Sequence, residues 1–267
     1  MRQAVVSSRH KSYSVEAIVV RAADFGEADR LVTLLTPFKG LVRAVARGAR
    51  KPKSRIGGSA DLLRHVKASL HEGRSLDGLS QVQSLDSFRS IRSDLSRMST
   101  ALYICELAER FSVEGGPNPP LFDHLLKTLR TLDAEQYRPL FSRWFEVRLL
   151  HLNGFLPVIG ACVDCGTPLE PRDHVFSTAR GGLVCPECRA TESDVLLPAS
   201  IGAIKLLRHM ARSEWDRVRP LQAGDDEVRQ ASRILREHLH FVLDRNVRST
   251  AFMDEVTSFQ DRVTGQV

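Results

Sequence analysis

The sequence predicts an α+β protein in which a small five-stranded β-barrel precedes an α-helical domain with an inserted four-cysteine module. Three observations lead to this prediction. Short apolar segments alternate with turn residues between residues 13 and 85, whereas later apolar residues recur every three or four positions. Two Cys-x2-Cys pairs interrupt the helical part. The expected parts are a flexible leader (1–12), a barrel (13–85) and a helical domain (86–267) that carries the cysteine module (160–192).

Five segments of the N-terminal region have the composition of short strands. YSVEAIVVRA is rich in β-branched residues, ADRLVTLLT follows the turn sequence DFGE, and TPFKG forms the next turn. In LVRAVARG, apolar Val42, Ala44 and Ala46 alternate with Arg43 and Arg47, which places both arginines on one face. LLRHVKASLHEG and LDGLSQVQSL complete a set of strands that is typical of a small barrel.

The rest of the chain has helical periodicity. An apolar stripe predicts a first helix that ends near Ser112, formed by Ile91, Leu95, Met98, Leu102, Cys105 and Ala108. EGGPNPP breaks the chain, and further helices are expected over LFDHLLKTLRTL, EQYRPLFSRWFEVRLLHLNG, LPASIGAIKLLRHMARS and DDEVRQASRILREHLHFVLDR. We interpret Cys105 as a buried core thiol. We also assign Phe141, Trp144 and Phe145 to the core, with a partner-binding patch as the alternative.

Positive charge is concentrated at the N-terminal end. Residues 1–60 hold twelve basic and four acidic side chains, whereas residues 61–267 hold 26 and 28. Seven cations with no acid among them lie within seventeen residues and form what we call the basic segment: Lys39, Arg43, Arg47, Arg50, Lys51, Lys53 and Arg55. Such asymmetry indicates a surface for an anionic partner, with a solvated face that maintains solubility as the alternative. Pro, Gly and strand alternation, rather than a basic amphipathic helix, favour nucleic acid over a membrane.

A basic strand and loop on a small barrel are typical of the oligonucleotide-binding (OB) fold. Aromatic residues are scarce in this region, so we expect binding that depends on phosphate contacts and is indifferent to base sequence. If all seven cations meet phosphates of single-stranded DNA, the slope of log affinity against log salt is about −5. Phe38 is a candidate for base stacking, although a hydrophobic plug in its turn is the preferred interpretation.

Four of the five cysteines have the spacing of a zinc site: Cys162, Cys165, Cys185 and Cys188. Two residues between thiolates let one tight turn supply two ligands, and two such turns complete a tetrahedron. Because four protein ligands leave no position for water or substrate, the expected Zn²⁺ is structural. A module that also contacts DNA or docks another protein is the alternative.

No sequence pattern indicates an enzyme. The chain contains neither a phosphate-binding P-loop nor a nucleophile elbow. Two acidic pairs are interpreted as a turn and a helix start rather than as Mg²⁺ ligands of a nuclease: Asp24 with Asp29, and Asp225 with Asp226. With no secretory signal and no apolar span of about 18 residues, the expected location is the cytoplasm.

The order of these features resembles the RecO family of bacterial recombination mediators. The resemblance rests on GEADRLVTLLTPFKGLVRAVARGARKPKSR, then RSDLSRMSTALYICELAERF, then HLNGFLPVIGACVDCG with the later CPEC. It extends from about Ser14 to Asp254, and the four cysteines match the zinc-bearing members. The family's OB barrel and following helical domain agree with the fold expected from the residues.

This resemblance implies a non-enzymatic role in DNA repair at the nucleoid. RecO proteins bind single- and double-stranded DNA, anneal complementary strands and act on DNA coated by the single-strand-binding protein. With RecR they help to load the recombinase RecA. The basic segment would supply the DNA contacts, whereas no motif identifies the residues that bind RecR or the acidic tail of the single-strand-binding protein. The main alternative is a zinc-ribbon protein whose barrel binds RNA.

Overall fold

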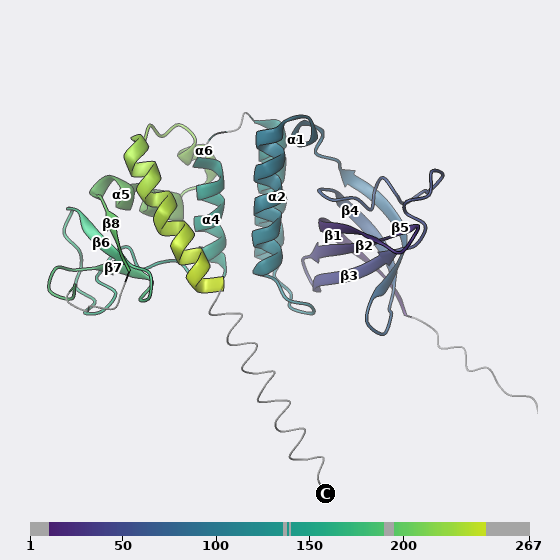
Figure 1. The fold of residues 1–267 in the computed structure, drawn as a ribbon, viewed down its shortest axis with the longest axis horizontal. Helices are drawn as coiled ribbons and strands as arrows, with labels where there is room; N and C mark the ends of the chain where they lie inside the picture. Colours follow the sequence, from purple (N-terminus) through teal and green to yellow (C-terminus); the bar gives the residue numbers. More distant parts are fainter. Residues whose placement is uncertain (1–10, 136–137, 139, 190–194, 244–267) are drawn as a thin grey trace, which may run out of the picture. The chain divides into compact units, whose positions relative to one another are not determined.

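The computed structural model describes residues 11–135, 138, 140–189 and 195–243 (Figure 1). The chain divides into two compact units, Met1–Tyr137 and Arg138–Val267, and each is described by itself. Most of the expected leader, residues 1–10, lies outside the described residues. Within the described part of the chain, no helix is both long and apolar enough to cross a membrane.

The first unit contains the predicted five-stranded barrel. Its strands are β1 (Ser12–Phe25), β2 (Asp29–Thr36), β3 (Gly40–Ala46), β4 (His65–His71) and β5 (Asp77–Asp86). They close in the order β1-β2-β3-β5-β4, with β4 paired to β1. All neighbours are antiparallel except β3 and β5, which run parallel and pair only through Ala44 with Asp77 and Val45 with Gly78. The predicted barrel is confirmed.

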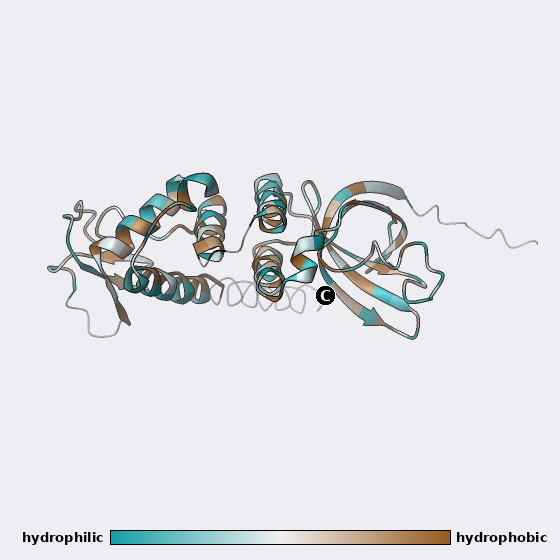
Figure 2. Ribbon diagram, turned by 90° about the horizontal axis from the view of Figure 1, so that it is seen from above, coloured by the Kyte–Doolittle hydropathy of each residue, from teal (hydrophilic) through white to brown (hydrophobic). Residues whose placement is uncertain are grey.

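Side-chain alternation places the core inside the barrel. In β3, Val42, Ala44 and Ala46 are buried, while Arg43 between them is exposed. Figure 2 shows the same mixture of hydrophobic and hydrophilic residues along the barrel strands. Val32 and Leu34 of β2 join the interior cluster, and each large aliphatic side chain there contributes roughly 1.5–3 kcal/mol by burial. The alternation therefore fixes which side chains of β3 face solvent.

Three helices follow the barrel: α1 (Arg89–Ser93), α2 (Leu95–Arg110) and α3 (Pro119–Ala134). The single helix predicted up to Ser112 is wrong at Asp94, whose side chain accepts a hydrogen bond from the backbone N–H of Arg97 and starts α2. The predicted stripe is also partly wrong, because Leu95 and Leu102 are exposed. Cys105 is buried as expected, and burial raises the pKa of its thiol to about 12.

The first compact unit extends beyond the barrel to residue 137, because α1, α2 and α3 pack on the barrel. His65 of β4 is buried, and its ring nitrogens lie 2.7 Å from a carboxylate oxygen of Glu16 and 2.8 Å from one of Asp86. Arg130 of α3 also donates to Asp86, at 2.8 Å. Burial alone would raise the pKa of Asp86, but the hydrogen bonds from His65 and Arg130 hold it below its usual value. The division into a barrel domain (13–85) and a helical domain (86–267) stays a prediction.

The turn between β2 and β3 is held by the segment that joins α2 to α3. The carbonyls of Pro37 and Lys39 accept hydrogen bonds from the backbone N–H groups of Asn118 (3.2 Å) and Gly115 (3.1 Å). Gly40 ends the turn with a φ of +60°, where a Cβ atom would lie 2.2 Å from the carbonyl oxygen of Val113. Only glycine combines this conformation with such a close approach of two backbone segments.

We expect Gly40→Ala to lower the free energy of unfolding by at least about 2 kcal/mol, since it adds left-handed strain and a backbone clash. Gly58→Ala is the matched control, because a Cβ atom added there would meet nothing within 4 Å and its φ is not positive. Chemical denaturation of both variants measures the difference. Equal stabilities would contradict the packing described for the β2–β3 turn.

The second unit combines helices with a small sheet. It contains α4 (Leu140–Leu152), β6 (His174–Ser177), β7 (Gly182–Val184), β8 (Leu196–Ala199), α5 (Ile201–Arg212) and α6 (Trp215–Val218), and residues 225–243 form a further helix. The sheet has the order β7-β6-β8 and was not predicted. Phe141, Trp144 and Phe145 are buried, and the rings of Phe141 and Trp215 meet edge to face at 4.8 Å. Their assignment to the core is confirmed.

Candidate nucleic-acid interface and metal centre

All seven side chains of the basic segment are exposed. Arg43 projects from β3 and Arg47 directly follows that strand, so both lie on the outer face as the alternation predicted. Lys39 lies in the β2–β3 turn, at the opposite end of β3. The other four cations belong to the β3–β4 loop, residues 47–64. The basic segment therefore spans the whole length of β3.

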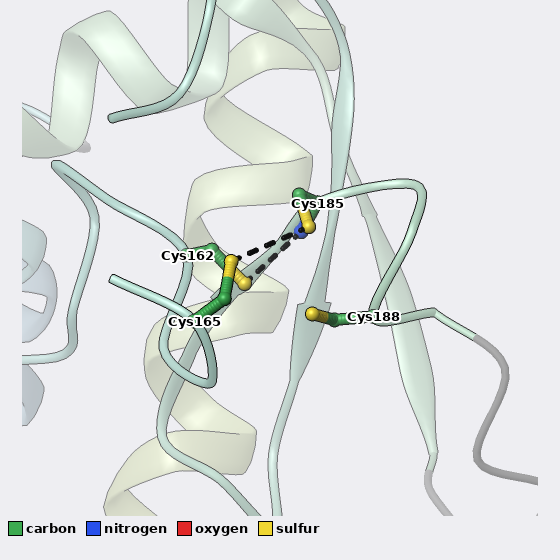
Figure 3. Close-up of side chains that lie close together, drawn as sticks. All are labelled: Cys162, Cys165, Cys185 and Cys188. Atoms are coloured by element: carbon green, nitrogen blue, oxygen red, sulfur yellow. Dashed lines mark hydrogen bonds between the residues drawn. The ribbon is translucent and has the colours of Figure 1, made fainter. Parts of the chain in front are cut away.

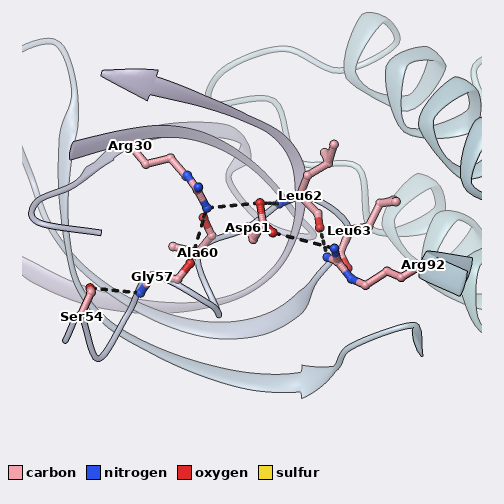
Figure 4. A network of polar contacts seen from close by, with 8 residues as sticks. All are labelled: Arg30, Ser54, Gly57, Ala60, Asp61, Leu62, Leu63 and Arg92. Atoms are coloured by element: carbon pink, nitrogen blue, oxygen red, sulfur yellow. Dashed lines mark hydrogen bonds and ion pairs between the residues drawn. The ribbon is translucent and has the colours of Figure 1, made fainter. Parts of the chain in front are cut away.

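Two arginines fix the C-terminal half of the β3–β4 loop (Figure 4). Arg30 of β2 pairs with Asp61 at 3.2 Å and donates to two backbone carbonyls of the loop. Arg92 of α1 approaches the same carboxylate at 3.8 Å and donates to the carbonyls of Leu62 and Leu63. These contacts hold the end of the loop against the barrel and leave its exposed N-terminal part, which carries the cations, on the surface.

The seven cations differ in what they contact. Arg50 pairs with Asp24 at 3.2 Å and donates to the carbonyls of Gly26 and Glu27, so it holds the β1–β2 turn. The Lys39 ammonium lies 4.5 Å from the centre of the Tyr13 ring. The other five form no ion pair among the described residues: Arg43, Arg47, Lys51, Lys53 and Arg55. Their role in DNA binding stays a prediction, and these five are the cations most available to phosphates.

Two aromatic side chains, Phe38 and Phe25, are exposed, which the sequence did not predict. Phe38 is 76% exposed, so its interpretation as a hydrophobic plug is wrong. It is held outward because the backbone on both sides of it is hydrogen-bonded to the α2–α3 connection. Phe25, at the end of β1, is 44% exposed, and no sequence pattern indicated it. For Phe38, the only available signal was a turn position next to a basic strand.

The four predicted cysteines come together in the second unit (Figure 3). Their sulfur atoms all lie within 4.8 Å of one another, and those of Cys165 and Cys185 are 3.8 Å apart. Tetrahedral metal–sulfur bonds of about 2.3 Å give a sulfur–sulfur separation of about 3.8 Å. The backbone N–H of Cys185 also donates to the sulfur of Cys162 at 3.4 Å. The cysteine cluster therefore fits a metal ion with four thiolate ligands.

Local hydrogen bonds favour anionic sulfur at two of the four cysteines, Cys162 and Cys165, whereas the side chain of Glu187 raises the pKa of Cys185 and the pKa of Cys188 is also raised. Burial alone would raise the pKa of Cys162, but backbone N–H groups of Cys165, Cys185 and Asp164 lower it to about 6. The hydroxyl and the backbone N–H of Thr167 lower the pKa of Cys165. A thiolate is the form that binds a metal, so these donors favour coordination.

Arg180 joins the two cysteine turns. Its guanidinium pairs with Asp164 in the first turn and donates to the carbonyl of Cys188 in the second at 3.4 Å. The apolar cluster beside them is small and includes two of the ligands, Cys162 and Cys185, packed with Val184. So little apolar area provides modest stabilisation, so a metal ion held by the four thiolates would be the main source of local stability.

Comparison with known proteins agrees with these observations. The family model described as "Recombination protein O N terminal" matches residues 11–88, and "Recombination protein O C terminal" matches residues 92–251. The first match covers the barrel, and the second covers the cysteine cluster. The two matches meet just after the barrel.

Three relatives named "DNA repair protein RecO" align over most of their length. The protein from Roseiflexus is 39% identical over 93% of this chain and 87% of its own. That from Symbiobacterium thermophilum is 35% identical over 92% and 98%, and one from Dehalococcoides mccartyi is 34% identical over 92% and 96%. With both family matches and three relatives aligned over nine-tenths of its length, the chain belongs to the RecO family of DNA repair proteins.

Proposed function

We propose that this chain is a non-enzymatic recombination mediator that binds single- and double-stranded DNA and anneals complementary strands. Together with RecR, it would promote loading of RecA onto DNA coated by the single-strand-binding protein. The main support is a row of five exposed cations along and beside β3, on the barrel of a RecO-family chain. Among the described residues, these five cations form no ion pair. Exposed cations without local partners attract phosphates at low cost, because no existing ion pair has to break.

The proposed annealing mechanism is electrostatic. Two DNA strands repel each other through their phosphates, and a basic surface that binds both lowers this repulsion and raises their local concentration. Phosphate contacts leave the base edges free to pair. No catalytic group is needed for this process.

We propose Zn²⁺ as the ion held by Cys162, Cys165, Cys185 and Cys188, with a structural role. Four thiolates within 4.8 Å of one another suit Zn²⁺ and leave no coordination position for a substrate. When bound, the ion would supply a cross-link between the two cysteine turns. The chain's own contribution is to hold four sulfurs together through backbone donors and through Arg180.

We also propose a docking surface in the second unit for the acidic tail of the single-strand-binding protein. A hollow is formed by Leu156, Pro157 and Val158 together with Arg208 and Arg212 of α5. Apolar lining beside two guanidinium groups suits a peptide that combines apolar and acidic side chains. We propose this hollow as the docking site for that tail.

Strand annealing tests the main proposal. With complementary labelled oligonucleotides at low salt, we expect the protein to accelerate duplex formation by about tenfold or more. An equal rate with and without the protein would contradict the proposal. Affinities for matched single-stranded DNA and RNA are measured in parallel, and a clear preference for RNA would support the RNA-binding alternative instead.

A further inference from the structure

We infer that the barrel binds a nucleic-acid strand with unpaired bases along β3, and that two bases stack on Phe38 and Phe25. This inference rests on the proposed DNA binding and names the class of strand that the barrel surface selects. It differs from the phosphate-only binding expected from the sequence, because both rings are exposed. Stacking platforms combined with a basic groove are how proteins hold single strands without reading their sequence.

The first stacking position is a hollow at the start of β3. Phe38, Lys39 and Arg43 line it together with Tyr13 of β1 and residues of the β4–β5 connection. Its volume of about 460 Å³ is sufficient for a nucleobase, and Arg43 is placed to contact the adjoining phosphate. This end of β3 therefore offers an aromatic face and an available cation in one hollow.

The second stacking position repeats this arrangement at the end of β3. Phe25, Val45 and Arg47 line a hollow of about 670 Å³, together with His71 and Leu76. Each hollow thus contains one exposed phenylalanine and one arginine of the basic segment. The same pairing of an aromatic ring with an available cation occurs at both ends of one strand.

The two hollows lie on either side of the short pairing between β3 and β5, which involves only Ala44 and Val45 of β3. Arg43 and Arg47 are four residues apart, or about 13 Å along an extended strand. A single strand that follows β3 would meet both positions in succession. Beyond Arg47 it would reach the cations of the β3–β4 loop.

Acidic side chains indicate that bases, rather than phosphates, enter the hollows. Glu72 and Asp77 line both of them. Asp77 accepts hydrogen bonds from the Tyr13 hydroxyl and from the backbone N–H of Gly73, at 3.0 Å for the latter, so it is held in place. Burial and this carboxylate raise the pKa of Tyr13, which keeps its hydroxyl protonated. A fixed carboxylate repels phosphate but can accept a hydrogen bond from the amino group of a base.

The Phe38 position is rigid before any ligand binds. The carbonyls on both sides of Phe38 are hydrogen-bonded to the α2–α3 connection, and the Thr36 hydroxyl accepts from the Lys39 N–H at 3.1 Å. An aromatic side chain on such a turn loses little conformational entropy when a base stacks on it. The ring is therefore exposed by the geometry of a fixed turn, not by a loose loop.

The test compares Phe25→Ala, Phe38→Ala and the double variant with wild type. Since removing a stacking ring costs roughly 5- to 100-fold in affinity per base, we expect losses of this size for single-stranded DNA. The slope of log affinity against log salt should stay unchanged, because no cation is removed. Affinity for blunt duplex and for an abasic strand of equal length should also stay unchanged, since neither presents an unpaired base.

Leu95→Ala is the matched control, because Leu95 is an 85% exposed apolar residue on α2 of the same unit. It should bind single strands as wild type does, and all variants should melt at the wild-type temperature. The stacking inference alone would be overturned if the double variant bound single-stranded DNA as tightly as wild type does. It would also be overturned if the double variant lost as much affinity for the abasic strand as for the normal strand. A wild-type protein that binds no DNA would overturn both this inference and the proposed function.

Discussion

The triple variant Lys51→Ala, Lys53→Ala, Arg55→Ala is expected to lose roughly 10- to 100-fold in affinity for single-stranded DNA at low salt, and most of its annealing activity. These three side chains are exposed and form no ion pair among the described residues, so their charge is available to phosphates. Each phosphate contact with a single strand contributes about 0.7 to the salt slope. Removing three should therefore make the slope shallower by about 2, which a titration of binding across a salt series measures.

The choice of these three residues follows from the structure. Arg50 lies beside them in the sequence but pairs with Asp24 and supports the β1–β2 turn, so its removal would mix local stability with DNA binding. Lys51, Lys53 and Arg55 precede the part of the loop that Arg30 and Arg92 fix. Their truncation should leave the thermal stability of the barrel unchanged.

An equal loss of charge elsewhere is the control: Lys205→Ala, Arg233→Ala, Arg236→Ala. These side chains are exposed on helices of the second unit and have no ion pair among the described residues. We expect this variant to keep a near wild-type affinity and slope. If both triple variants lose affinity equally, net charge rather than the basic segment determines binding. If the loop variant anneals as fast as wild type, the basic segment is not the DNA surface.

The sequence was most informative where a short-range pattern determines structure. Period-two alternation predicted which side chains of β3 face outward, because successive side chains of a strand point to opposite faces. The spacing of Cys162 and Cys165 predicted a shared turn, because two ligands from one turn need about two intervening residues. Both features depend on neighbours in the chain.

Features that depend on distant contacts could not be predicted. The helix break at Asp94 is an exception, because it depends on a local choice: the Asp94 side chain can either continue a helix or cap a new one, and apolar periodicity does not decide between the two. Arg50 and Lys51 are indistinguishable in sequence, yet only Arg50 meets the carboxylate of Asp24, which barrel closure brings near. Phe38 is apolar, so burial was expected from the sequence. Only the backbone hydrogen bonds from Gly115 and Asn118 show why it stays exposed.

Loss of one thiolate ligand is expected to have the largest effect on stability. Structural Zn²⁺ sites contribute on the order of 10 kcal/mol of binding free energy in small zinc modules, and the apolar cluster beside this site is small. Cys165→Ser is the most informative variant because Cys165 is exposed, so its substitution removes a metal ligand without removing a buried side chain. Cys162 and Cys185 are buried and also serve as packing residues. We expect wild type to contain one zinc per chain and Cys165→Ser to contain far less, with a thermal transition of the second unit lowered by many degrees.

Cys105→Ala separates metal loss from the loss of any cysteine. Cys105 is buried in α2 of the first unit and is not one of the four clustered cysteines, so this variant should keep its zinc. A chelator added to wild type should lower the thermal transition as Cys165→Ser does. Added to Cys165→Ser, the chelator should have no further effect. Because the basic segment belongs to the first unit, binding of single-stranded DNA should survive zinc loss. Equal metal content in wild type and Cys165→Ser would refute the metal centre, whereas zinc loss with an unchanged melting curve would refute only its structural role.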